Sequence, residues 1–193
     1  MQITNEQDKA ASEIVRLITS ELDNNGQMDP ATVIASCARL SGSFLFRSFN
    51  FPDKNISPGT AVLSEVANEK GPDLINTLGW VLSTHGIDID QTLLNSSSNA
   101  ESKLSFMDTL KLLQDKARVI MENARLTPEQ MAHSCAMATA FIIKECKSQL
   151  PVESGFNTAV YGFIEGSKTF PPEQTRKQES KRSFFKFWKK SGA

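Results

Sequence analysis

The sequence predicts an all-α protein, a compact bundle of six or seven helices followed by a basic, aromatic C-terminal tail. Three observations favour this class. Apolar residues recur at helical spacing in most segments up to residue 167, cap residues and prolines stand where these segments begin, and no segment has a convincing period of two. The 193 residues are 39% hydrophobic and 22% charged, which is the composition of a globular domain.

The first two helices are expected at residues 4–24 and at residues 30–49. Gly26 ends the first, whose apolar face is formed by Ile14, Val15, Leu17, Ile18 and Leu22. Asp29 and Pro30 open the second, as an N-cap acceptor followed by proline at the first helical position. Gly42 lies between two serines in the middle of the second helix, and these small residues would let another backbone approach closely.

Proline marks the starts of the next elements. A Ser-Pro pair predicts a short helix over 57–69, and a Gly-Pro pair is expected to break it and to start a fourth helix over 71–86. Residues 87–103, with the polar run NSSSNAES, form a predicted linker.

Three more helices are expected in the second half, at residues 104–125, 127–148 and 153–167. Thr127 and Gln130 form a predicted capping box at the start of the middle one. The chain then divides into a single helical domain over 1–170 and, over 171–193, a tether with the basic amphipathic tail.

Two segments of the chain are similar to each other. DPATVIASCA at 29–38 aligns without gaps with TPEQMAHSCA at 127–136, and NTLGW at 76–80 is matched by NTAVY at 157–161. One interpretation is a duplication of a three-helix unit, with copies at 4–86 and 104–167. The alternative is chance recurrence, because proline starts and small-residue helix faces are common in α proteins.

Composition indicates a cytoplasmic protein. The N-terminus lacks the charged and apolar regions of a signal peptide, and no apolar run reaches the ~18 residues that a membrane-spanning helix needs. Three cysteines at irregular spacing favour reduced thiols over a disulfide framework. Phosphate-binding loops and nucleophile elbows are missing from the sequence, so we expect no cofactor.

One acidic helix face offers an alternative enzymatic function. Glu65 and Glu69 are four residues apart, and Asp73 continues the row. Such carboxylates could hold Mg²⁺ in a metal-dependent phosphoester or small-molecule enzyme. A solvated helix face explains the same pattern, and no second carboxylate pair is evident to complete the site.

The C-terminal segment carries the strongest functional signal. From Arg176 onward there are seven basic residues and one acidic residue, a charge of +6, whereas the remaining 14 basic and 21 acidic residues give −7. On a helical wheel the aromatic side chains cover one arc and the lysines the other. The predicted binding residues are Lys181, Arg182, Phe184, Phe185, Lys186, Phe187, Trp188, Lys189 and Lys190.

This pattern predicts a non-enzymatic interaction protein that docks through the tail. The partner is an anionic membrane surface, at the inner face of the membrane, or another protein. The tail could also fold back on the acidic domain. Nucleic acid is a less favoured partner, because the acidic domain would repel a polyanion.

Overall fold

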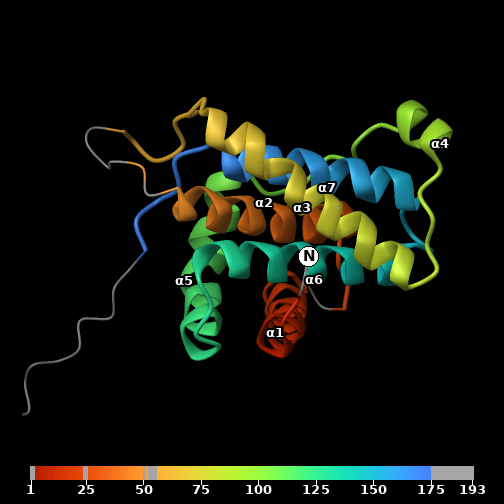
Figure 1. Cartoon of the computed structure of the whole chain (residues 1–193). Helices are drawn as coiled ribbons and strands as arrows, with labels where there is room; N and C mark the ends of the chain where they lie inside the picture. Colours follow the sequence, from red (N-terminus) through yellow and green to blue (C-terminus); the bar gives the residue numbers. More distant parts are fainter. Residues whose placement is uncertain (1–2, 24–25, 50, 52–55, 175–193) are drawn as a thin grey trace, which may run out of the picture.

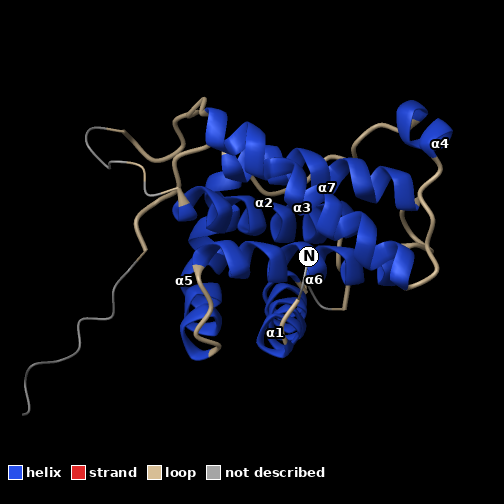
Figure 2. Cartoon of the chain, viewed as in Figure 1, coloured by secondary structure: helices blue, strands red, loops and turns tan. Residues whose placement is uncertain are grey.

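The computed structural model describes residues 3–23, 26–49, 51 and 56–174, and the regular structure within these ranges is helical (Figure 2). An antiparallel bridge between Ala61 and Thr169 joins two segments outside the helices. The all-α prediction is therefore confirmed. The described helices are α1 (Asn5–Leu22), α2 (Pro30–Ser48), α3 (Glu65–Thr84), α4 (Gln91–Ser96), α5 (Phe106–Asn123), α6 (Pro128–Cys146) and α7 (Val152–Ser167).

The helices form three layers, with α2 and α6 in the middle (Figure 1). On one side α7 packs on α2 and α3 packs on α6, and on the other side α1 packs on α6 and α5 packs on α2. The short helix α4 lies at one end of the body, next to α7.

Small side chains explain why α2 and α6 occupy the middle layer. Both helices are buried around most of their circumference and are rich in alanine, serine and cysteine. A helix that is apolar on all sides is stable only when other helices cover it, and small side chains let several backbones approach at once. The amphipathic sequences of α1 and α5 instead suit an outer layer.

The predicted helix starts of α2 and α6 are confirmed. The carboxylate of Asp29 accepts a hydrogen bond from the Thr32 amide at 2.9 Å. Thr127 and Gln130 form the expected capping box, with each side chain accepting from the other residue's amide. Both helices carry proline in the first turn, where its missing amide would have no intrahelical partner.

The prediction of two helices over 57–69 and 71–86 is wrong. Residues 56–64 are not helical, and α3 begins at Glu65 after the N-cap Ser64 and passes through Pro72 without a break. Pro72 removes one amide from the helix ladder, so the Asn68 carbonyl loses its partner. Both residues are exposed, and water can hydrate that carbonyl, which explains why the helix continues.

The predicted linker over 87–103 contains helix α4 and is fastened to the body. The side-chain amide of Asn157 donates to the carbonyls of Leu94 and Ser97, at 3.1 and 2.8 Å. The Ala100 amide donates to the Thr158 hydroxyl at 2.8 Å. Polar side chains of α7 therefore hold this segment, which buries no residue of α4.

Glycines allow α2 and α7 to cross in close contact. A Cβ atom at Gly42 would lie 2.5 Å from the Phe163 carbonyl oxygen, and one at Gly166 would lie 2.4 Å from the Arg39 carbonyl oxygen. Real Cβ atoms do not approach this closely, so both positions require glycine. The predicted close approach at Gly42 is confirmed.

Candidate functional site

The predicted tail residues lie outside the described part of the chain. These are Lys181, Arg182, Phe184, Phe185, Lys186, Phe187, Trp188, Lys189 and Lys190. The structure does describe the segment from which the tail continues, residues 168–174.

Residues 168–170 pair with the segment that precedes α3. The Phe170 amide donates to the Thr60 carbonyl and the Gly59 amide donates to the Phe170 carbonyl, both at 2.8 Å. The Val62 amide donates to the Lys168 carbonyl at 2.7 Å. These bonds join the chain that follows α7 to the segment that precedes α3.

Side chains of α2 and α5 hold the residues that follow. The Phe170 ring is buried and meets the Phe46 ring edge-on, with 5.8 Å between centroids. The guanidinium of Arg47 donates to the Pro172 carbonyl at 2.7 Å, and the Gln114 amide group donates to the Glu173 carbonyl at 3.2 Å. The first residues of the predicted tether thus contact the body.

The candidate metal residues Glu65, Glu69 and Asp73 lie exposed along α3. The ammonium group of Lys70, between them in sequence, forms an ion pair of 3.1 Å with Glu129 of α6. No group of three or more potential metal ligands occurs in the part of the chain that the structure describes. The geometry therefore gives the metal-dependent enzyme no support.

Both histidines that the sequence offers have contacts within the body. The Thr77 hydroxyl donates to the Asp73 carbonyl at 2.8 Å, so His133 Nδ1, 2.9 Å from the same oxygen, donates to it. Burial lowers the pKa of His133, which favours the neutral ring. The His85 ring packs edge-on against Phe141.

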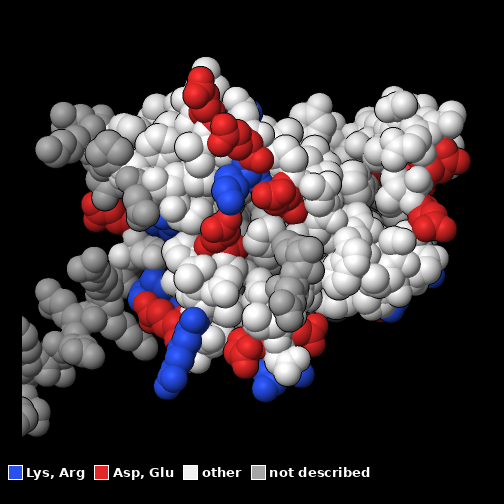
Figure 3. Space-filling view, in the orientation of Figure 1, with Lys and Arg blue, Asp and Glu red and all other residues white. Residues whose placement is uncertain are grey.

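The N-terminal half of α3 presents an outer face that mixes apolar and acidic side chains. Val66, Glu69 and Asp73 recur at three- and four-residue spacing and are exposed, Val66 to 42%. Leu63, just before the helix, is 90% exposed. Figure 3 shows acidic side chains gathered over this part of the molecule. We call these four residues the α3 outer face.

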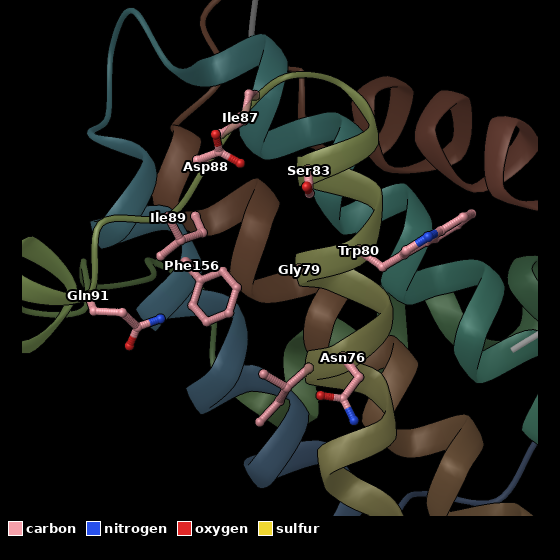
Figure 4. A pocket seen from close by; sticks show the side chains of 10 residues that line it. Asn76, Gly79, Trp80, Ser83, Ile87, Asp88, Ile89, Gln91 and Phe156 are labelled. Carbon is pink, nitrogen blue, oxygen red and sulfur yellow. The ribbon is translucent and has the colours of Figure 1, made fainter.

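A hollow of about 370 Å³ lies at the other end of α3 (Figure 4). Apolar side chains from three segments line one side of it: Ile75, Ile87, Ile89 and Phe156. The Trp80 ring points away from Phe156, across the helix, and is 54% exposed. Sequence analysis missed this hollow, because its walls come together only when 87–91 folds back along α3.

A second hollow, of about 630 Å³, lies between α2, α7 and residues 99–105. The guanidinium of Arg39 is 13% exposed in its wall and donates to Glu165 at 2.6 Å, to Ser102 at 3.1 Å and to the Leu104 carbonyl at 2.5 Å. Glu165 balances the charge of Arg39, so this arginine holds three segments together and leaves the hollow without an unpaired buried charge.

No described helix is both long enough and apolar enough to cross a membrane. Comparison of the chain with family models, curated proteins and solved structures found no match.

Proposed function

We propose that this is a non-enzymatic, cytoplasmic interaction protein that docks on an anionic membrane surface through residues 181–190. The observation that carries the proposal is the composition of that segment, which has five basic and four aromatic residues among ten. Aromatic rings favour the membrane interface, and each nearby lysine adds ~1 kcal/mol of attraction to an anionic leaflet.

The attachment of residues 168–174 supports this role. Backbone pairing with residues 59–62 and the contacts of Arg47 and Gln114 fix the point from which the tail continues. A binding segment that starts at a fixed point carries the whole body with it when it docks. The acidic body would be repelled by an anionic surface, which leaves the tail as the attractive part.

Vesicle co-sedimentation tests the proposal. The full-length protein should sediment with phosphatidylcholine vesicles that contain phosphatidylserine, and a chain ending at Gln174 should not. Trp188→Ala should weaken binding at every salt concentration, because apolar burial is insensitive to salt. Lys186→Glu with Lys189→Glu should weaken it mainly at low salt, because screening shortens the Debye length to ~3 Å at 1 M.

The body offers matched controls for these variants. Trp80→Ala removes the exposed tryptophan of α3, and Lys9→Glu with Lys147→Glu reverses two exposed charges outside the tail. Both should leave vesicle binding unchanged. Equal binding to neutral and anionic vesicles would contradict the electrostatic part. Absence of binding to either would contradict the membrane proposal and favour a protein partner.

We also propose that α1–α3 and α5–α7 are copies of one three-helix unit. Two observations support this proposal. Helices α2 and α6 have equal lengths, and both their starts and their ends are 98 residues apart. The first helix of each unit packs on the second helix of the other unit, α1 on α6 and α5 on α2. In an experimental structure, residues 4–49 should superpose on 102–147, with Cys37 on Cys135. Different crossing angles of the two helix pairs would contradict the duplication.

A further inference from the structure

We infer that the α3 outer face, formed by Leu63, Val66, Glu69 and Asp73, is the intramolecular docking site of residues 181–190 when no membrane is present. The inference rests on the proposed function of that segment, and adds a second, competing destination for it. The site is an outward helix face whose inner side packs on α6 and whose own side chains are exposed.

The first argument is complementarity. The α3 outer face places two exposed apolar side chains, Leu63 and Val66, beside two carboxylates, and residues 181–190 combine four aromatic rings with five basic groups. The exposed Leu63 and Val66 would be covered by aromatic rings, and the removal of this apolar surface from water is favourable. Glu69 and Asp73 would meet lysines, and the body and tail carry opposite net charges, −7 and +6.

The second argument is the position where the tail begins. The bridge between Thr169 and Ala61 places the chain after α7 beside the segment that enters α3. A path from Gln174 back to Thr169, across the bridge and forward to Val66 is at most about 39 Å, taking ~3.3 Å per residue and ~5.5 Å between paired strands. The aromatic residues lie 10 to 14 positions after Gln174, a reach of about 33 to 46 Å.

Chymotrypsin cleavage of the full-length protein, without vesicles, tests the inference. The protease cuts after aromatic residues, so docking should protect Phe184, Phe185, Phe187 and Trp188, and mass spectrometry can follow their release. Glu69→Lys with Asp73→Lys should speed cleavage in the tail by about three- to tenfold, because protection follows the docked population. The matched control, Glu13→Lys with Glu145→Lys, makes the same charge change at exposed sites elsewhere. It should leave the rate of tail cleavage unchanged.

A charge swap separates docking from nonspecific effects. Lys186→Glu with Lys189→Glu should also speed cleavage, and combining it with Glu69→Lys and Asp73→Lys should restore slow cleavage. Circular dichroism and thermal unfolding of each variant show whether the body remains folded. Equal cleavage rates in wild type and all variants would overturn the inference.

Vesicle binding distinguishes the two proposals. If the tail is shared between two destinations, Glu69→Lys with Asp73→Lys should strengthen binding to anionic vesicles more than the matched control does. Vesicle binding with rapid cleavage in the absence of vesicles would leave the proposed function intact and overturn the intramolecular site. Slow cleavage without vesicle binding would support the intramolecular site and contradict the proposed function.

Discussion

The thiol of Cys37 lies 3.4 Å from the backbone carbonyl oxygen of Cys135 and donates a hydrogen bond to it, at the point where α2 crosses α6. Both side chains are completely buried. Burial raises the pKa of Cys37 to about 12 and raises that of Cys135 well above its ordinary value. Thiolates are the reactive form of cysteine, so both thiols should be inert in the folded protein at neutral pH.

Thiol labelling checks this expectation. With Ellman's reagent at pH 8, Cys146 should react first, because it is partly exposed, although burial also raises its pKa. Cys37 and Cys135 should react only at the rate of unfolding. In guanidinium chloride all three should react together. Labelling of either buried cysteine as fast as Cys146 in the native protein would contradict the packing of α2 on α6.

Alanine at the α2–α7 crossing should destabilise the body. Gly166→Ala would place a methyl group 2.4 Å from the Arg39 carbonyl oxygen, and Gly42→Ala one 2.5 Å from that of Phe163. Because the obstacles are backbone atoms, the helices must separate. We expect each substitution to lower the free energy of unfolding by about 2–4 kcal/mol, measured by urea denaturation.

Gly79→Ala is the matched control within α3. A Cβ atom there would meet nothing within 4 Å, and alanine has the higher helix propensity. The substitution should raise stability by about 0.5–1 kcal/mol. Equal destabilisation at Gly79, Gly42 and Gly166 would show that loss of glycine itself, rather than the crossing, is responsible.

Local sequence signals were sufficient for the fold class and for most helix boundaries. Asp29, Thr127 and the prolines after them predicted the starts of α2 and α6, because cap hydrogen bonds involve residues close in sequence. The same logic failed at Pro72. There the helix continues because water can hydrate the Asn68 carbonyl, and the sequence does not show which backbone groups will face water.

The candidate surfaces depended more on tertiary structure. The row of Glu65, Glu69 and Asp73 was visible as helical spacing, but the pairing of the segment before α3 with the chain after α7 was not. That pairing joins residues 59–62 to residues 168–170, more than 100 positions apart and without a recognisable strand pattern. The hollow around Arg39 was hidden for the same reason, since its walls come from α2, α7 and residues 99–105.

Replacing Arg39 should loosen the segment before α5. Arg39→Met keeps most of the packing but removes hydrogen bonds to Glu165, Ser102 and the Leu104 carbonyl. We expect a loss of about 1–3 kcal/mol in urea denaturation, moderated because Glu165 is 41% exposed and can be rehydrated. Lys70→Met, which breaks the exposed pair with Glu129, should have a much smaller effect on stability.

The environment of His133 predicts a pH dependence of stability. Burial lowers its pKa in the folded protein and outweighs the attraction of Asp73 and Glu129, while Lys70 adds to the lowering. The folded state therefore binds fewer protons than the unfolded state between the folded pKa and the unfolded value of ~6.5. Stability is fully present above that value and falls as the pH drops toward the folded pKa.

Thermal or urea unfolding between pH 7.5 and 5.5 measures this effect in a window above the titration of ordinary carboxylates. Wild-type stability should decline across the window, and His133→Gln, which keeps a donor near the Thr77 hydroxyl but cannot be protonated, should decline less. A slope that is unchanged in His133→Gln would mean that the ring gains a proton in the folded protein as readily as in the unfolded chain, because the nearby carboxylates then offset the burial.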